Sequence, residues 1–115
     1  MMRVKRIEKD KYTVYIYNNL YTICFVGSDL YYKDEQVKGY IQYKDRTIYI
    51  DSRISIESEK HCLIHELTHA VIYETQIMPI SQYNEEHLCE LMALYGKFII
   101  DLSNKIISLR KRYDN

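Results

Sequence analysis

The sequence has few of the residues that mark several common classes of protein. Its 115 residues include no tryptophan, one proline, three glycines and three cysteines. The odd cysteine count, with no C-x-x-C spacing among Cys24, Cys62 and Cys89, argues against a disulfide scaffold and against a cysteine zinc knuckle. We therefore expect reduced thiols in a cytoplasmic protein.

Long apolar runs and an excess of one charge are also missing. No uninterrupted apolar segment approaches the roughly 20 residues that a membrane span needs, and no apolar region follows the basic N-terminus as in a signal peptide. Sixteen basic and sixteen acidic residues cancel, which is not the charge signature of a nucleic-acid-binding protein. We expect no membrane segment and no direct nucleic-acid partner, and we expect the basic residues 110–112 to solvate a helix end.

The length and composition fit one folded domain that covers residues 1–115. The hydrophobic fraction is 47%, which is enough for a packed core. Thirteen tyrosines are the most unusual feature of the composition. Because tyrosine has an apolar ring and a polar hydroxyl, it suits half-exposed surfaces and the walls of clefts.

The first half of the sequence is typical of β-strands. Residues 12–17 are all β-branched or aromatic, and residues 20–26 form a second strand-like run after Asn18 and Asn19, which predicts a hairpin. Residues 31–38 are polar and are expected to form a loop. Apolar alternation in residues 40–43 and 47–50, around a polar turn at residues 44–46, predicts a second hairpin.

The second half is typical of helices. Ser55 or Ser58 can cap a helix that carries acidic residues in its first turn and extends to about Gln76. After a link with Pro79 and Ser81, a long helix should run from about residue 82 or 85 to about residue 112. The predicted fold is α+β, a compact domain in which a small, mainly antiparallel sheet packs on both helices.

The long helix carries two apolar stripes at helical spacing. The second stripe (Cys89, Ala93, Gly96 and Ile100) is mostly small residues, which would let a neighbouring helix approach closely. A helix that is apolar on two sides is expected to be buried between layers. Glu86 and Glu90 lie along the edge of the small stripe and should face whatever packs there. The first stripe consists of Leu88, Leu91, Met92, Tyr95, Phe98, Ile99, Leu102, Ile106 and Leu109.

One motif carries metal chemistry, the H-E-x-x-H sequence at residues 65–69. Residues four apart lie one turn apart on the same helix face, so His65 and His69 can both bind one Zn²⁺. Glu66 then stands beside the metal, where it can act as general base and general acid. An ordinary amphipathic helix with two unrelated histidines is the alternative. His61 is also four residues from His65, but no glutamate fills the base position of that pair.

A catalytic zinc needs a third protein ligand, and the candidates lie in the sequence N-E-E-H-L-C-E at residues 84–90. Glu86 and Glu90 are four apart and share a helix face. We predict Glu86 as the ligand and Glu90 as the acceptor for the second N–H of a ligand histidine. For Glu85 we expect no metal role, only the favourable placement of a negative charge at a helix N-terminus. His87 points to a different face from Glu86.

These residues resemble the ImmA/IrrE-like metallopeptidases, in particular the short versions in phages and mobile elements. The resemblance covers about residues 39–102, through Y-I-Q-Y-K-D-R-T-I-Y-I-D, C-L-I-H-E-L-T-H-A-V-I-Y-E and N-E-E-H-L-C-E-L-M-A. It implies a zincin fold with a gluzincin-like site of two His and one Glu on zinc. It also supports Glu86 as the ligand. In the family, a small residue follows the ligand glutamate three positions later, a polar residue four later and an alanine seven later, and counted from Glu86 these are Cys89, Glu90 and Ala93. The family's Leu-Met-Pro-like segment is missing after Ala93.

The sequence therefore predicts a cytoplasmic zinc metallopeptidase, an endopeptidase rather than an exopeptidase. The resemblance implies a protein substrate or regulator as partner, such as a repressor encoded by a phage or mobile element. Two alternatives stay open. One is a zinc-containing binding module that regulates a partner without hydrolysing it, as some family members have little peptidase activity. The other is an interaction protein without a metal.

Overall fold

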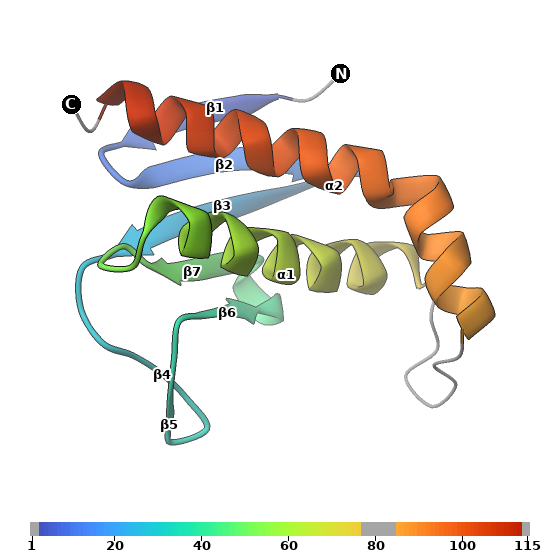
Figure 1. Ribbon diagram of the computed structural model, residues 1–115, viewed down its shortest axis with the longest axis horizontal. Helices are drawn as coiled ribbons and strands as arrows, with labels where there is room; N and C mark the ends of the chain where they lie inside the picture. Colours follow the sequence, from blue (N-terminus) through green and yellow to red (C-terminus); the bar gives the residue numbers. More distant parts are fainter. Residues whose placement is uncertain (1–2, 77–84, 114–115) are drawn as a thin grey trace.

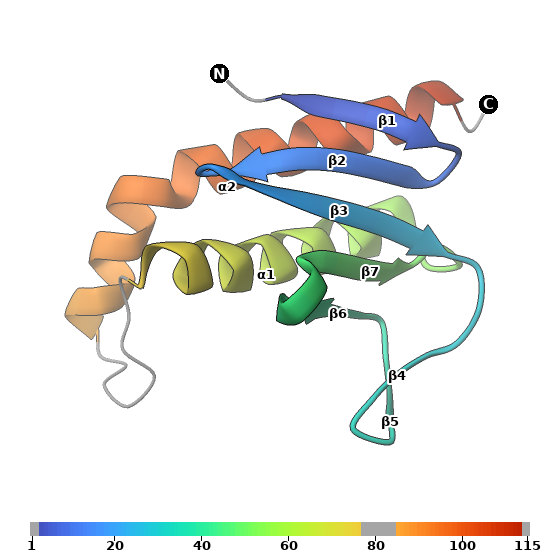
Figure 2. The same ribbon diagram turned by 180° about the vertical axis from the view of Figure 1, so that it is seen from behind.

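A five-stranded mixed sheet carries two helices on one of its faces. This computed structural model describes residues 3–76 and 85–113, and Figures 1 and 2 show that both helices cover the same side of the sheet. The helices are α1 (Ile56–Thr75) and α2 (Glu85–Tyr113). In sheet order the strands are β1 (Val4–Glu8), β2 (Lys11–Ile16), β3 (Asn19–Val26), β7 (Thr47–Asp51) and β6 (Gly39–Gln42). The expected α+β class is confirmed.

The sheet is mainly antiparallel but has one parallel pair in its centre. β1–β2, β2–β3 and β6–β7 pair antiparallel, whereas β3 and β7 pair parallel. Because parallel neighbours need a crossover connection, the chain between them makes a long excursion. That excursion contains a second, two-stranded sheet of β4 (Leu30–Tyr32) and β5 (Glu35–Val37), then β6 and a 3₁₀ turn, η1 (Tyr43–Asp45). The parallel pair was not predicted.

Three details of the predicted strands were wrong. β1 was not predicted, because its two apolar residues, Val4 and Ile7, are three positions apart and the rest of it is charged, and most of it stays exposed. Residues 31–38 form the β4–β5 hairpin instead of a loop, since Lys33 and Asp34 both adopt positive φ (52° and 67°) as a two-residue hairpin turn requires. In the first hairpin Ile16 pairs with Asn19, so the turn is Tyr17–Asn18, one residue earlier than expected.

Alternate residues of the sheet and one face of each helix share a single core. Strand residues such as Val14, Ile23 and Ile48 are fully buried, as the alternation predicts. The helix residues in the core recur at spacings of three and four. They are Leu63, Leu67, Ala70 and Val71 of α1, and Leu91, Ile99, Leu102, Ile106 and Ile107 of α2.

α1 is fixed at both of its ends. Ser55 is the N-cap, and its hydroxyl accepts a hydrogen bond from the Ser58 backbone N–H at 3.1 Å, which selects Ser55 over Ser58 as the cap. The helix ends before Gln76, which has the left-handed φ of 55°. In the last turn the Glu74 carboxylate accepts hydrogen bonds from Asn19 at 2.8 Å and from Arg46 at 3.1 Å.

The basic segment at residues 110–112 was expected to solvate a helix end, and for Arg110 this is wrong. Arg110 is only 3% exposed, and its guanidinium donates to Glu59 of α1 and to Asp10. It also lies 3.7 Å from the centre of the Phe25 ring. Its burial follows from Glu59, because a carboxylate in a core needs a cationic partner.

The first half of α2 is more exposed than its two apolar stripes predicted. Figure 1 shows this part of the helix extending past the end of α1. Cys89, Ala93 and Ile100 of the small-residue stripe are exposed, and so are Leu88 and Met92 of the other stripe. The expectation of a helix buried on two sides was therefore wrong for this half. None of the helices in the described residues is long and apolar enough to span a membrane.

Candidate functional site

The H-E-x-x-H sequence lies in the middle of α1, as predicted. Leu63, Leu67 and Ala70 turn into the core, and this fixes the rotation of the helix about its axis. His65 and His69 then lie on its exposed side, and Glu66 is buried between them and the sheet. One helix therefore presents two imidazoles and one carboxyl group to the same region.

The two histidines are placed as a metal-binding pair would be. Their Nε2 atoms lie 3.2 Å apart, and their ring centres 4.9 Å apart. Two nitrogens that bind one zinc at about 2.0–2.1 Å in tetrahedral geometry are separated by about 3.3–3.4 Å. The Nε2 separation of His65 and His69 is thus close to that of two ligands of a shared zinc ion.

The ionisable groups of the motif have environments that suit this chemistry. Burial raises the pKa of Glu66, which is 7% exposed, to about 7. Burial, and then the nearby charge of His65, lower the pKa of His69. A neutral imidazole is the form that binds a metal, and a carboxyl group with a pKa near neutrality can both accept and donate a proton.

A cavity of about 270 Å³ opens beside these three residues. It lies between α1 and β6, the strand at the end of the sheet order. Apart from the motif itself, its walls are tyrosines and aliphatic residues. These are Tyr32, Val37, Gly39, Tyr40, Ile41 and Tyr43.

Gly39 allows β6 to approach its neighbours closely. A Cβ atom at this position would lie 3.1 Å from the Ile50 side chain, 3.1 Å from the Tyr49 carbonyl oxygen and 3.7 Å from Cys62 of α1. The alternation in residues 40–43 did not predict this close approach. The cavity-lining role of Tyr32 and Val37 was missed altogether, because a polar segment with no predicted strand gave no indication of where it would lie.

A second hollow of about 340 Å³ lies on the other side of the two histidines. Its walls include Ile64, Thr68 and Ile72 together with His61. His61 is exposed, as expected for the first turns of the helix. The histidine pair therefore lies between two depressions, so that a chain crossing the site could continue in both directions.

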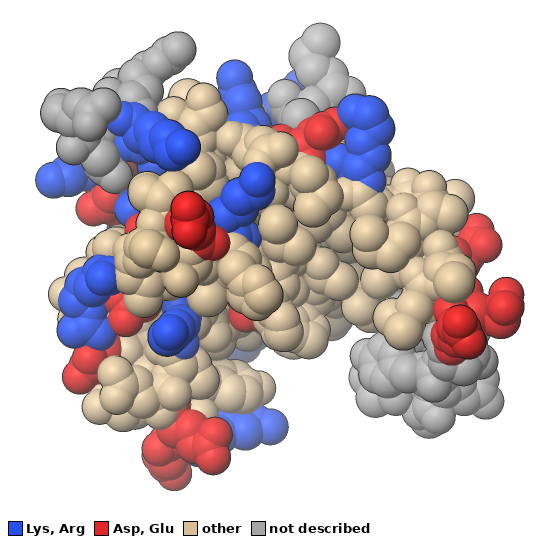
Figure 3. Space-filling model, in the orientation of Figure 1, with Lys and Arg blue, Asp and Glu red and all other residues tan. Residues whose placement is uncertain are grey.

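Glu86 and Glu90 lie in the first two turns of α2, and both are exposed. Acidic side chains gather in Figure 3 at the end of the molecule where α2 begins. Within residues 3–76 and 85–113, no three His, Cys, Asp or Glu side chains come together as a metal site. The structure thus brings His65, Glu66 and His69 together but does not add Glu86 or Glu90 to them. The link with Pro79 and Ser81, and the earlier helix start at residue 82, lie outside the described residues.

Comparisons with known proteins found no similar protein. No protein-family model, no curated protein and no solved structure matches the chain. The function must therefore be inferred from the chain's own residues, above all from the paired histidines and the buried glutamate of α1.

Proposed function

We propose that the chain is a zinc-dependent endopeptidase with a zincin-like site, of the ImmA/IrrE-like kind. One observation carries the proposal. His65 and His69 hold their Nε2 atoms 3.2 Å apart on the exposed side of α1, beside the buried Glu66 and an open cavity. Two imidazoles on one helix are two of the three protein ligands of a zinc peptidase, and the neighbouring carboxyl group stands where the general base is needed.

Each residue of the motif has a separate task in this proposal. Bound zinc would polarise the scissile carbonyl and make a water molecule more acidic. Glu66 accepts the proton of the attacking water and donates it to the leaving amine. Its raised pKa, about 7, suits both transfers. His65 and His69 fix the position of the metal relative to Glu66, since all three belong to one rigid helix.

Glu86 is the proposed third ligand, and Glu90 the acceptor for a ligand histidine N–H. Their support is the one-turn spacing on α2, which places two carboxylates on one helix face. Both are exposed. Binding of zinc would therefore have to draw the start of α2 towards α1.

The proposed substrate is an extended segment of a protein. β6 borders the cavity and has a neighbouring strand on one side only, so that a peptide could pair with its free edge. The depressions on both sides of the histidines favour cleavage within a chain over removal of a terminal residue. The family resemblance points to a cytoplasmic regulator of a phage or mobile element as the substrate.

The second candidate function is a zinc-containing binding module without peptidase activity. It is favoured by the absence of an acidic third ligand beside His65 and His69 among the described side chains. A site with two protein ligands could hold zinc between this chain and a partner that supplies the remaining ligands. Its partner would be the same regulator.

Metal analysis and substitutions in α1 test the proposal. Protein purified without chelator should contain about one zinc per chain, and the double variant His65→Ala/His69→Ala should contain none. His61→Ala is the matched control, because it removes an exposed histidine one turn earlier and should keep the metal. Glu66→Gln should keep zinc and lose hydrolysis, since an amide cannot accept the proton. Full metal content in the double variant would refute the metal site. Unchanged hydrolysis by Glu66→Gln would refute the role of Glu66.

A further inference from the structure

The cavity beside Glu66 has the size and lining of a pocket for one apolar side chain. Pockets that enclose whole drug-sized molecules measure about 300–1,000 Å³, so a cavity of about 270 Å³ suits a single large residue better than a cofactor. Outside the H-E-x-x-H residues, no charged group among the described residues lines it. Aromatic walls favour aromatic or large aliphatic partners.

The β4–β5 hairpin supplies two residues of this lining, Tyr32 and Val37. The Tyr32 ring packs on Tyr40 with the ring centres 5.8 Å apart, and Tyr40 stacks on Tyr49 at 4.9 Å. Tyr32 is therefore held in place by a row of rings that continues into the main sheet. Its neighbour Tyr31 does not line the cavity and is 58% exposed.

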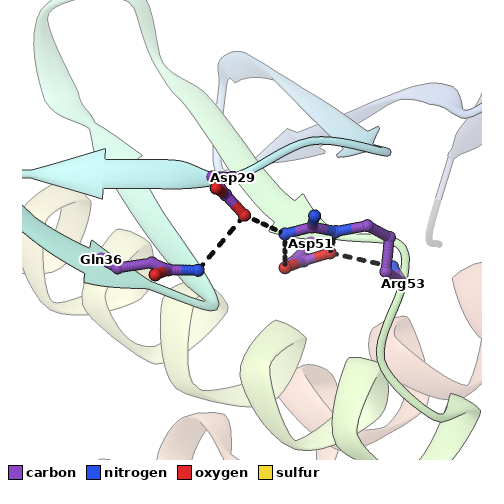
Figure 4. Close-up of polar contacts among 4 residues, drawn as sticks. All are labelled: Asp29, Gln36, Asp51 and Arg53. Carbon is purple, nitrogen blue, oxygen red and sulfur yellow. Dashed lines mark hydrogen bonds and ion pairs between the residues drawn. The ribbon is translucent and has the colours of Figure 1, made fainter.

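The hairpin depends on side-chain contacts for its position. It forms its own two-stranded sheet, and an isolated hairpin is at best marginally stable in water. Figure 4 shows the polar link: the Arg53 guanidinium donates to Asp51 at the end of β7 and to Asp29 at the start of the hairpin, at 2.7–3.0 Å. Asp29 also accepts a hydrogen bond from Gln36 of β5 at 3.3 Å.

The link has the chemistry of a fixed brace. Arg53 binds both carboxylate oxygens of Asp51, and such paired hydrogen bonds fix the guanidinium plane. Hydrogen bonds from Arg53 lower the pKa of Asp51, so this carboxylate stays charged at neutral pH. Nη2 of the same guanidinium, which donates to Asp51, also donates to Asp29 and so links the hairpin to β7.

We infer that Tyr32 is a specificity-determining residue, which selects an aromatic or large aliphatic substrate residue next to the cleaved bond, and that Arg53 is the positioning residue that holds it there. This inference rests on the proposed peptidase function. It adds the class of substrate residue that the site accepts. Arg53 does not line the cavity, so its effect on selectivity must pass through the hairpin.

A degenerate peptide library tests the inference in two ways. The zinc-loaded wild-type protein is incubated with the library, and cleavage products are identified by mass spectrometry. In parallel, zinc-loaded Glu66→Gln is used to capture peptides from the same library, because this variant should bind without hydrolysis. Wild type should cleave next to Phe, Tyr or Leu, and Glu66→Gln should enrich the same residues. Cleaved sequences are then remade as single peptides with Phe or Ala at the residue next to the cleaved bond.

Substitutions in the hairpin separate selectivity from general damage. Tyr32→Ala should reduce the Phe-over-Ala ratio of kcat/KM by about tenfold or more, and Arg53→Ala should act in the same direction. Tyr32→Phe, which keeps the ring, should retain the preference, and so should the control Tyr31→Ala. Circular dichroism and zinc content of each variant show whether it is folded. If Tyr32→Ala fails these checks, Tyr32→Leu replaces it.

The outcomes distinguish this inference from the proposed function. Enrichment of apolar residues by Glu66→Gln without cleavage by wild type would refute the peptidase and leave the pocket's selectivity standing. Cleavage with no preference next to the bond, or a preference that folded Tyr32→Ala retains, would refute the inference and leave the peptidase standing. If the wild type cleaves no peptide and Glu66→Gln enriches none, both the peptidase and the inference are refuted.

Discussion

Arg110 donates hydrogen bonds from Nε and Nη2 to the two carboxylate oxygens of Glu59, at 2.8 and 2.9 Å. The pair joins the last turns of α2 to the first turns of α1, and both residues are almost completely buried. Because Glu59 and the two histidines belong to the same helix, this pair also fixes the orientation of the candidate site. The Asp10 carboxylate, at 3.1 Å from Nη1, is a further acceptor of this guanidinium.

Arg110→Ala should destabilise the protein strongly. Removing one partner of a buried ion pair leaves an uncompensated charge and typically costs about 3–5 kcal/mol. The free energy of unfolding from urea titrations, measured on metal-free protein, checks this prediction. Lys111→Ala, an exposed neighbour, is the control and should change stability by at most about 0.5 kcal/mol.

The double variant Glu59→Leu/Arg110→Met should recover most of that loss. Apolar residues of similar volume remove both charges, and such replacements are often neutral or even stabilising. If the double variant were as unstable as Arg110→Ala, the contacts of Arg110 with Asp10 and the Phe25 ring would have to carry the stabilisation instead. The same urea titrations decide between these two results.

The burial of Glu66 should make the metal-free protein less stable as the pH rises. In the unfolded chain its pKa is about 4.5, and in the folded protein about 7. The folded state therefore retains the proton more strongly. The resulting stabilisation is present below about pH 4.5 and is lost as the pH rises through about 7.

Glu66→Gln should remove this pH dependence. At pH 8, with a chelator present, the variant should be more stable than wild type by on the order of 1–3 kcal/mol, since a pKa shift of one unit corresponds to about 1.4 kcal/mol. At pH 4.5 the two should differ much less. Thermal denaturation at several pH values measures the difference, and equal profiles for both proteins would show that Glu66 is not desolvated.

Gly96→Ala should stabilise the protein. A Cβ atom at this position would lie 2.9 Å from the methyl group of Met92, which is the flexible end of an exposed side chain and can move aside. Alanine is favoured over glycine inside a helix by about 0.8–1.0 kcal/mol. A rise in melting temperature checks the prediction. A fall would mean that Gly96 packs against something other than Met92.

Glu86→Ala should weaken zinc binding more than Glu90→Ala. Loss of a ligand removes a direct bond to the metal, whereas loss of an outer hydrogen-bond partner typically costs about 10–100-fold in affinity or activity. Competition with a chelator of known affinity measures both variants. Glu85→Ala, also exposed in the first turn of α2, is the control and should bind zinc as wild type does. A larger effect of Glu90→Ala would reverse the two roles.

The site helix could be predicted from sequence because its signals are local. Ser55 caps α1, and the spacing of His65 and His69 fixes their common face within one helical turn. Strand composition and alternation also predicted the β2–β3 and β6–β7 hairpins of the main sheet. In each case the residues that determine the structure are at most a few positions apart, or form one continuous run.

The features that the sequence did not predict depend on contacts between distant residues. Arg110 and Glu59 are 51 positions apart, and each alone is typical of an exposed helix terminus. The small residues of α2 share a face, but Cys89 and Ala93 are exposed. The position of Tyr32 depends on Arg53, Asp29 and Asp51, which are charged residues that composition alone places on the surface.

The segment that contains the β4–β5 hairpin leaves the main sheet after Val26 and returns to it after Lys38, and these two points are adjacent in space. The Val26 carbonyl accepts a hydrogen bond from Ser52 N–H at 2.9 Å, and the Lys38 carbonyl accepts one from Asp51 N–H at 2.8 Å. The chain between Val26 and Lys38 is therefore a closed excursion, and doubling the length of such a loop costs only about 0.6 kcal/mol. Insertions and deletions there can rebuild one wall of the cleft without moving α1. Proteins that share the proposed metal site of α1 could in this way diverge in the substrates they accept.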